Sequence, residues 1–420
     1  MAYTETKTTG YGTRVKNSCM GIGVGFALFI GGTVLLWWNE GRAVRTADML
    51  EEAQQACEVM ENPSKKDKSL DGELVCGTAM ATTEDSLVDK EFGIGATAIS
   101  LKRTVEYYQW EEYKHEETED KMGGKEVKTI TYTYDTKWVS SPINSKEFHD
   151  PDYKGLNVVL ANVEDDEQWA ENVTFGAYSL NESLIHSMTD YEPLELDLSD
   201  DLLSQMDKNT QEAYERFYGR VKRDSLSTDS GYNYVHVSEN VLYLGVNPAA
   251  PKVGDVRVTF EKVLPAKVTV VSVVDGDSFK PFKAKNGEHF QKLVMGKKGI
   301  DEIFDGEKTT NTFLTWIFRL VGTLLVIGGL KGIFGIIETL LKVVPFLANI
   351  VGWGVGFVCT IVGIVWSLIV IAIAWVFYRP VLGIVLLVIA GLLIWIFAFG
   401  GKNKIKKLAS KKTEEEPAQA

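Results

Sequence analysis

Near its carboxyl end the chain carries 19 consecutive residues without a charge, at residues 381–399 (VLGIVLLVIAGLLIWIFAF). A helix of this length rises about 28 Å, which matches the hydrocarbon thickness of a bilayer. Three further apolar runs lie at residues 18–38, 313–330 and 343–378. Because uncharged runs of this length are typical of membrane spans, the chain is predicted to be an integral membrane protein in a lipid bilayer.

The first apolar run has to be distinguished from a signal peptide. Residues 18–38 are longer than a typical signal-peptide apolar region, and no small-residue cleavage site follows them. The run ends at Trp37 and Trp38, and tryptophan favours the headgroup level of a membrane. We therefore interpret residues 18–38 as an uncleaved first span.

Basic residues beside the spans predict the orientation of the chain. Lys331 and Lys342 lie between the second and third runs, and six lysines follow the last run at residues 402–412. With four spans, both termini are predicted to be cytoplasmic (or nucleoplasmic), and the region after the first span lies on the opposite side. The predicted order is a cytoplasmic amino-terminal flank at residues 1–17, a first span at 18–38, an acidic lumenal or periplasmic domain at 39–310, a second span at 313–330, a cytoplasmic interfacial connector at 331–344, a third span at 345–378, a fourth span at 381–399 and a basic-then-acidic cytoplasmic tail at 400–420.

The boundary between the third and fourth spans has two interpretations. Residues 343–378 are too many for one upright helix and too few for two helices with a turn. In the first interpretation Pro345 begins the third span, and Arg379 and Pro380 form a turn at the outer face. In the second, Pro380 kinks a longer helix and the hairpin lies near Trp366 and Ser367. Either way the runs form a tight helical bundle.

The region between the first two runs differs in composition from the rest of the chain. It contains 31 of the 44 basic residues and 52 of the 57 acidic residues. This excess of negative charge argues against nucleic acid as a partner. Its roughly 270 residues are enough to bury the core of one large or two small units.

Residue patterns predict that this acidic domain is β-rich. Period-two alternation typical of strands occurs at residues 101–110, 128–134, 255–260 and 267–274. Asp275-Gly276 is a hairpin-turn signal, and Ser199 before Asp200 is a helix cap followed by apolar residues at helical spacing. The predicted fold class is an α-helical membrane protein (four transmembrane helices) with a large β-rich α+β extramembrane domain between helices 1 and 2.

Two cysteines and two sequons in the acidic domain have alternative interpretations. Cys57 and Cys76 are candidates for a disulfide if the compartment is oxidising, and are otherwise free thiols. Asn172 and Asn181 begin N-x-S/T sequons, which would be glycosylated only in a eukaryotic lumen. In any other compartment these two sequons are chance matches.

The sequence carries no catalytic or ligand-binding motif that we recognise. The five histidines are scattered, and the motifs HExxH, CxxC, GxSxG and GxxxxGK are missing. We therefore predict no catalytic residues, no metal, no cofactor and no small-molecule substrate. The acidic cluster at residues 164–167 lacks the spacing of a calcium-binding loop. Titratable residues are also missing from the middle of the spans, which argues against an ion-coupled carrier.

Glycines in the apolar runs predict close helix packing. Glycines four residues apart share one helix face and let a neighbouring backbone approach, within or between chains; the alternative is that glycine is simply common in spans. The predicted pairs are Gly21 with Gly25, Gly328 with Gly332, and Gly352 with Gly356.

Arg319 is a charged residue inside the second apolar run. An intramembrane charge is costly unless it snorkels to the interface or pairs with an opposite charge. The first interpretation is that Arg319 snorkels to the outer interface. The second is an ion pair with Glu40, which the predicted orientation places at the same interface, and which would fix the second span to the first.

Seven short motifs in order along the chain point to a known family. They are WNEGRAV at residues 38–44, DGELV at 71–75, DKEFG at 89–93, RTVEYYQW at 103–110, GDVRVTF at 254–260, WIFRLVG at 316–322 and AWVFYRP at 374–380. With these motifs the chain resembles the transmembrane protein 43 family, also called LUMA, from about residue 14 to 399. Glu40, Arg319 and Arg379 each lie within a motif, which raises their expected importance.

The resemblance implies a four-span protein with a large lumenal or periplasmic domain and no enzymatic activity. It implies that animal members are self-associating scaffolds of the endoplasmic reticulum and inner nuclear membrane that bind emerin and lamins. A bacterial member would lie in the cytoplasmic (inner) membrane. We therefore expect a homo-oligomeric scaffold that organises other membrane proteins. The alternative is a channel or a channel-regulating subunit.

Overall fold

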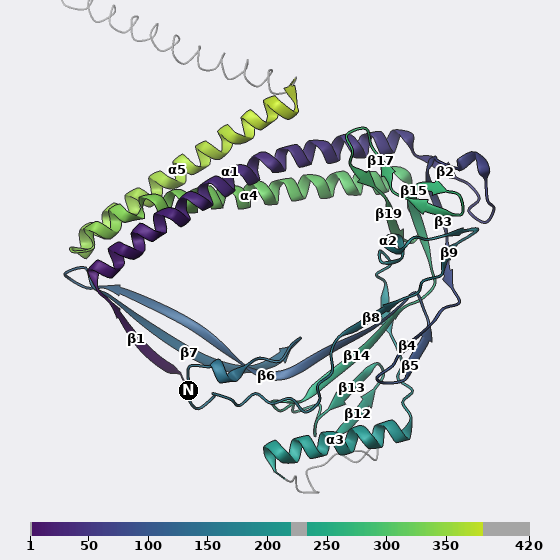
Figure 1. Cartoon of the computed structure of the whole chain (residues 1–420), viewed down its shortest axis with the longest axis horizontal. Helices are drawn as coiled ribbons and strands as arrows, with labels where there is room; N and C mark the ends of the chain where they lie inside the picture. Colours follow the sequence, from purple (N-terminus) through teal and green to yellow (C-terminus); the bar gives the residue numbers. More distant parts are fainter. Residues whose placement is uncertain (1, 220–232, 381–420) are drawn as a thin grey trace, which may run out of the picture. The chain divides into compact units, whose positions relative to one another are not determined.

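The computed structural model describes residues 2–219 and 233–380 and divides into two compact units. The first unit, named the β domain, comprises Met1–Thr9, Met49–Asp120 and Glu126–Gly306. The second, named the helical unit, comprises Gly10–Asp48, Lys121–Lys125 and Glu307–Ala420, of which the residues up to 380 are described. Figure 1 labels the helices and strands of both.

The first sheet of the β domain has eight strands and contains the long hairpin of β6 (Ser100–Asp120) and β7 (Glu126–Val139). Its order is β1-β7-β6-β14-β13-β12, with β11 paired to β14 and β8 paired to β6. The other strands are β1 (Tyr3–Thr9), β8 (Asp166–Trp169), β11 (Tyr191–Pro193), β12 (Val235–Ser238), β13 (Val241–Leu244) and β14 (Val256–Val263). In β14 the buried side chains of Val256, Val258 and Phe260 alternate with partly exposed ones, which is the pattern that predicted this strand.

The second sheet has seven strands, in the order β10-β9-β3-β15-β16, with β19 paired to β15 and β2 paired to β3. Its strands are β2 (Glu58–Met60), β3 (Leu74–Thr83), β9 (Val173–Phe175), β10 (Tyr178–Ser179), β15 (Ala266–Asp275), β16 (Ser278–Lys280) and β19 (Lys292–Met295). The central strand β15 is buried from Val268 to Val274. The predicted turn at Asp275-Gly276 is confirmed, and Gly276 has a φ of 60°.

Smaller elements complete the β domain. They are β4 (Ser86–Asp89) paired with β5 (Ile94–Thr97), β17 (Phe282–Lys283) paired with β18 (His289–Phe290), α2 (Glu182–Ile185), α3 (Asp200–Tyr218), and 3-10 turns at Lys68–Leu70 and Ser145–Glu147. The predicted cap of α3 is confirmed, because the Ser199 side chain accepts a hydrogen bond from the Leu202 N–H. The four predicted strand regions coincide with parts of β6, β7, β14 and β15, apart from Asp255, which precedes β14, so the prediction of a β-rich domain is confirmed.

One face of the second sheet is covered by the ends of two long helices. Leu50 and Ala53, near the end of α1 (Tyr11–Ala56), are fully buried or nearly so. They belong to the same apolar cluster as Phe304, near the start of α4 (Ile300–Leu341), and as Leu74 and Val271 of the sheet. This cluster fixes both helix ends to the β domain.

The helical unit contains most of three long helices, namely α1, α4 and α5 (Pro345–Tyr378). Each is long and apolar enough to cross a membrane, and the predicted fourth span at residues 381–399 lies outside the described residues. Helix α5 begins at Pro345 and continues without interruption past Ser367, so the alternative hairpin near residue 366 is wrong. Helix α4 continues to Leu341, so most of the connector predicted at residues 331–344 belongs to this helix.

The hairpin of β6 and β7 makes contacts that bear on the predicted orientation. Strand β1 pairs with β7 over seven residue pairs, although the sequence predicts that a membrane separates these two segments. Within the helical unit, the Gly123 N–H donates to the Val343 carbonyl at 3.1 Å, and Arg14 Nη1 donates to the Gly124 carbonyl at 3.3 Å. A helix that crosses a bilayer has its ends on opposite sides. These contacts and the predicted crossing of α1 therefore exclude each other within one bilayer.

Candidate functional site

Helices α1 and α4 lie side by side with their backbones in direct contact (Figure 1). A Cβ atom added at Gly25 would lie 2.8 Å from the Gly329 carbonyl oxygen, and one at Gly329 would lie 2.5 Å from the Phe29 nitrogen. A Cβ at Gly32 would lie 2.8 Å from the Gly322 carbonyl oxygen. Because no side chain fits into these gaps, glycine sets the separation of the two helices.

The six glycines predicted to pack differ in how closely another helix approaches them. Gly25 and Gly332 lie in the α1–α4 contact, where a Cβ at Gly332 would be 3.0 Å from the Gly25 Cα. A Cβ at Gly352 of α5 would lie 2.6 Å from the Glu338 carboxyl carbon. An added Cβ would meet no described atom within 4 Å at the remaining three, Gly21, Gly328 and Gly356.

The prediction from glycines four residues apart missed most of the glycines in the contact between α1 and α4. Gly32, Gly322 and Gly329 were not predicted, yet all three meet backbone atoms of the partner helix. The signal that identifies them is a spacing of seven residues, from Gly25 to Gly32 and from Gly322 to Gly329. Seven residues are about two helical turns, so each pair lies on one face.

Glu40 of α1 and Arg319 of α4 form the ion pair that the sequence suggested as one interpretation. Arg319 Nε donates to Glu40 Oε1 at 2.6 Å, and Nη2 donates to Oε2 at 2.8 Å. Trp375 of α5 donates from Nε1 to the same Oε2 at 2.7 Å. The Glu40 side chain is only 3% exposed and that of Arg319 16%. The geometry is bidentate, which is the strong form of an arginine–carboxylate pair.

A polar network adjoins this pair. Arg42 donates from Nη1 to Asn311 Oδ1 and from Nη2 to Thr315 Oγ1, both at 3.0 Å. The Asn311 amide donates to the Ala43 carbonyl at 2.9 Å, and the Asn39 amide donates to the Thr315 carbonyl at 3.0 Å. Side chains of each helix therefore hydrogen-bond to the backbone of the other.

Asn39, Arg42, Asn311 and Thr315 of this network were not predicted from the sequence. Asn311, Thr315 and Arg319 are spaced by four residues and therefore share one face of α4. That spacing of polar residues, next to the charge in an apolar run, was the available signal. The two helices are thus joined by glycine contacts around Gly25 and Gly32 of α1 and by polar groups between Asn39 and Ala43.

A cavity of about 270 Å³ lies beside the ion pair, lined by residues of α1, α4 and the end of α5. Its charged lining residues are Glu40, Lys308, Arg319 and Arg379. Arg379 directly follows the last residue of α5 and is exposed. The sequence placed Arg379 and Pro380 in a turn at the outer face, and helix α5 ends before both of them.

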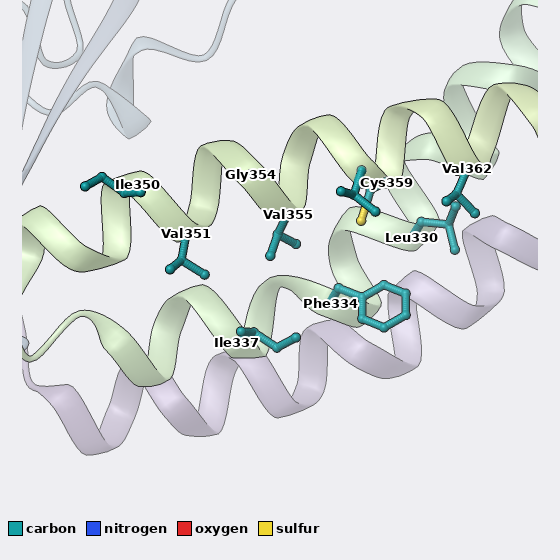
Figure 2. A pocket seen from close by; sticks show the side chains of 10 residues that line it. Leu330, Phe334, Ile337, Ile350, Val351, Gly354, Val355, Cys359 and Val362 are labelled. Carbon is teal, nitrogen blue, oxygen red and sulfur yellow. The ribbon is translucent and has the colours of Figure 1, made fainter. Parts of the chain in front are cut away.

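A second cavity, of about 600 Å³, lies between α4 and α5 and is lined only by apolar residues, glycine and Cys359. Figure 2 shows Phe334 and Ile337 of α4 on one side, with Val351 and Val355 of α5 on the other. Such a surface suits acyl chains or another helix. Among the described residues that line it, the Cys359 thiol is the one side chain that is not hydrocarbon.

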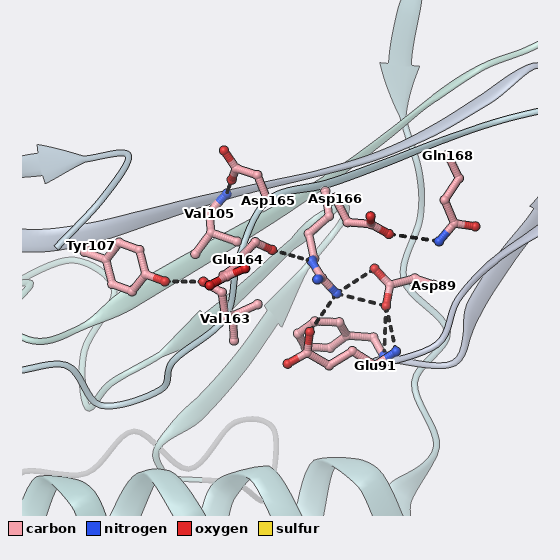
Figure 3. A network of polar contacts seen from close by, with 11 residues as sticks. Asp89, Glu91, Val105, Tyr107, Val163, Glu164, Asp165, Asp166 and Gln168 are labelled. Atoms are coloured by element: carbon pink, nitrogen blue, oxygen red, sulfur yellow. Dashed lines mark hydrogen bonds and ion pairs between the residues drawn. The ribbon is translucent and has the colours of Figure 1, made fainter.

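In the β domain, a buried ion pair joins Arg103 of β6 to Asp89 of the β4–β5 hairpin (Figure 3). Arg103 Nη1 donates to both oxygens of Asp89, at 3.0 and 2.8 Å, and lies 3.0 Å from Glu91 Oε2. Its Nε donates to the Glu164 carbonyl at 2.9 Å. Through Nε and Nη1, Arg103 holds the hairpin and a loop against the sheet. No group of three or more metal-ligating side chains occurs among the described residues.

Cys57 and Cys76 lie next to each other as free thiols. Their mutual hydrogen bond raises the pKa of the Cys57 thiol and lowers the pKa of the Cys76 thiol. The structure thus brings the two candidate cysteines together without a disulfide between them.

The two sequon asparagines differ in how their side chains are engaged. Asn172 is exposed, and its amide donates to Asp85. The Asn181 amide donates to the Phe279 carbonyl at 2.9 Å and to Gln291 Oε1 at 3.1 Å. A glycan on either asparagine would replace these contacts, and Asn172 is the more exposed of the two.

Comparison with known proteins assigns the family. The model of the transmembrane protein 43 family matches residues 107–380, which is more than half of the chain. The chain belongs to the transmembrane protein 43 family. Transmembrane protein 43 of Homo sapiens is 29% identical over 395 residues, covering 91% of this chain and 90% of the human protein. The Rattus norvegicus protein is 28% identical over 389 residues (90% and 89%), and the Drosophila melanogaster homolog 26% over 370 residues (86% and 90%).

Membership in the transmembrane protein 43 family agrees with the three apolar helices, and it makes the chain an integral membrane protein. The matched residues include Arg319, Trp375 and Arg379 of the helical unit. These relatives carry no enzyme name. No solved structure matches the chain.

Proposed function

We propose that this protein is a non-enzymatic membrane scaffold that organises membrane protein complexes through helix packing and its β domain. The observation that carries the proposal is the joint between α1 and α4. Backbone contact at glycines and the buried Glu40–Arg319 pair give these helices one fixed arrangement. Each helix then continues without a break into residues of the β domain. A fixed helix pair of this kind suits a membrane protein that presents a separate domain to partners.

The polar groups of the helical unit are used for structure, which supports a scaffold over an enzyme or carrier. Both Glu40 oxygens are bound by Arg319 or Trp375. Residues 18–38, 313–330 and 345–378 contain no Asp, Glu, His or Lys. Proton-coupled and ion-coupled carriers use such residues near the midplane. The contact between α1 and α4 therefore has a structural role, and its engaged carboxylate is poorly suited to binding a transported ion or proton.

The proposal includes an orientation and partners. The β domain lies on the lumenal or periplasmic side, and the basic carboxyl-terminal tail on the cytoplasmic side. Exposed apolar side chains on α5, such as Trp353 and Phe377, face lipid, a second copy of the chain or another membrane protein. The compartment is the endoplasmic reticulum and inner nuclear membrane in a eukaryote, or the cytoplasmic membrane in a bacterium.

Proximity labelling in the native membrane tests the scaffold. A biotin-ligase or peroxidase label is inserted in the β domain, and the same label on a single-span protein of that compartment is the control. We expect a reproducible set of membrane proteins, including unlabelled copies of this chain, that the control does not enrich. Identical sets for both proteins would argue against a scaffold. Unitary currents in a planar bilayer, changed by an Arg319 substitution, would instead support the channel alternative.

A further inference from the structure

We propose that the cavity beside the Glu40–Arg319 pair binds the phosphate of an anionic phospholipid headgroup. The cavity lies entirely within the helical unit, where α1, α4 and the end of α5 meet. Binding there would make the joint between these helices sensitive to the lipid around it. This role is additional to the proposed scaffold and does not depend on it.

The charge of the cavity favours an anion. Three cationic residues line it, Lys308, Arg319 and Arg379, against a single carboxylate, that of Glu40. Glu40 and Arg319 form an ion pair and balance each other, so the net positive charge of the lining comes from its other basic residues. A metal cation would meet net repulsion, whereas a phosphate would meet complementary charge.

Two guanidinium groups have donors available for a ligand. Arg319 uses Nε and Nη2 for Glu40, and Nη1 makes no hydrogen bond to the described residues. The exposed Arg379 side chain likewise makes no hydrogen bond or ion pair with the described residues. The planar fork of arginine matches phosphate oxygens better than the point charge of lysine does.

The size and the aromatic lining favour a headgroup attached to a membrane. A volume of about 270 Å³ is small for a whole drug-sized ligand but admits a phosphate and the group beside it. Trp316 and Trp375 line the cavity, and indole rings are favoured at the headgroup level of a bilayer. Phe313 and Trp316 of α4 are each more than 60% exposed, which leaves an apolar surface for the acyl chains.

A lipid is favoured over a free phosphate because the membrane supplies it at the right place. Phospholipid headgroups form the interface where the apolar runs end, so a lipid phosphate is held beside the cavity at high local concentration. Inorganic phosphate has the same oxygens but no anchor, so it must bind from dilute solution.

Native mass spectrometry of the full chain tests this proposal. The protein in detergent is mixed with equal amounts of phosphatidylglycerol and phosphatidylcholine, and bound lipids are counted. We expect retention of phosphatidylglycerol, reduced about fivefold by Arg379→Gln and less by Arg379→Lys. Lys331→Gln is the matched control, because Lys331 is exposed on α4 outside the cavity. Thermal midpoints of all variants show whether each one is folded.

Three results would overturn the proposal. Arg379→Gln with unchanged phosphatidylglycerol binding would remove the cavity as the site. An equal loss in Lys331→Gln would indicate surface charge alone. Complete displacement of the lipid by millimolar inorganic phosphate would show that the cavity recognises free phosphate and not a lipid.

Discussion

Glu40 is an acidic side chain held almost completely away from solvent in a chain of apolar helices. Its carboxylate is stabilised by two hydrogen bonds from Arg319 and one from Trp375. Removing one partner of such a buried pair leaves an uncompensated charge and costs about 3–5 kcal/mol. Replacing both charges removes this cost. Each of the two residues therefore depends on the other.

We predict that Glu40→Gln and Arg319→Gln each lower the thermal midpoint of the purified protein strongly. The double variant should be closer to the wild type than either single variant, because no unpaired charge is left in it. Glu338→Gln is the control, since its partner Lys342 is one turn away at 3.4 Å and the Glu338 side chain is 36% exposed. It should change stability by less than about 1 kcal/mol. Additive effects in the double variant would show that the pair does not act as a unit.

Asp255 is a buried carboxyl group in the β domain, in the matched GDVRVTF motif. Its Oδ2 accepts hydrogen bonds from the Tyr243 hydroxyl and from the Lys252 N–H, while Oδ1 has no partner among the described residues. Burial raises the pKa of Asp255 from 3.8 to about 6. The folded state therefore binds this proton more tightly than the unfolded state does.

A raised pKa at Asp255 predicts a pH-dependent loss of stability. The contribution of the protonated group is complete below pH 3.8 and is lost as the pH rises through about 6. The shift corresponds to about 3 kcal/mol. We expect Asp255→Asn to be less stable than the wild type at pH 4.5 and to reach or exceed it at pH 7.5, as measured by thermal unfolding.

Asp85 provides the control of opposite sign. Hydrogen bonds from Asn172 lower the pKa of Asp85, so its stabilising contribution is present at neutral pH and lost in acid. The stability of Asp85→Asn relative to the wild type should therefore fall as the pH rises. If the two variants shift in the same direction, the burial of Asp255 does not control its titration.

At the scale of elements, the contact between α1 and α4 depends on which face of each helix carries glycine. Gly328 and Gly329 are adjacent in α4, but only Gly329 meets α1, and an added Cβ at Gly328 meets no described atom within 4 Å. We predict that Gly329→Ala forces the helices apart and destabilises the protein by about 1–3 kcal/mol. Gly328→Ala should be neutral or slightly stabilising, because alanine favours helix more than glycine does.

Thermal unfolding of the two variants in the same detergent measures this difference. The pair is matched in sequence, depth and chemistry, so general effects of added volume cancel. Equal stability of Gly328→Ala and Gly329→Ala would mean that the helices do not approach closely in the membrane protein.

The elements that were predicted correctly are those with a strong local pattern. Period-two alternation identified β14 and β15, and Ser199 identified the start of α3. The 21-residue length of β6 could not be predicted, because its outer half carries exposed charged residues that resemble a loop. The glycine contact was also only half predicted, since a sequence does not show which face of a helix meets its partner. Gly21 and Gly25 have the same spacing as any packing pair, but only at Gly25 would an added Cβ meet the neighbouring helix.

At the scale of the whole molecule, the sequence and the strand pairing disagree about the sides of the membrane on which the two ends of α1 lie. The uncharged run at residues 18–38 and the lysines after residue 400 predict that residues 1–17 and the β domain lie on opposite sides of the membrane. The pairing of β1 with β7 joins them on one side. Sequence patterns report the preference of each segment for lipid or water, whereas strand pairing reports complementarity between segments. The preference of a segment for lipid cannot be derived from strand pairing, and strand pairing cannot be derived from that preference.

The free energies of the two arrangements favour the one in which α1 crosses the membrane. Seven cross-strand pairs on an edge strand contribute about 0.2–1 kcal/mol each. Residues 18–38 hold nine Val, Leu, Ile and Phe side chains, and removing each from water contributes about 1.5–3 kcal/mol. Val24, Ile30 and Val34 are each more than half exposed and gain this energy only from lipid. In a bilayer, therefore, α1 should cross and β1 should leave β7.

Cysteine cross-linking in intact membranes tests this conclusion. Thr6 lies opposite Thr129 in the β1–β7 pairing, and Thr104 lies opposite Thr259 in the β6–β14 pairing. In a chain without its own cysteines, a short thiol cross-linker should join Thr104→Cys to Thr259→Cys, which lie in one domain. It should not join Thr6→Cys to Thr129→Cys, because the bilayer separates them. A cross-link between residues 6 and 129 at the efficiency of the control pair would place residues 1–17 beside the β domain. The proposed orientation would then be wrong, and α1 would have to lie along the membrane with both ends on one side.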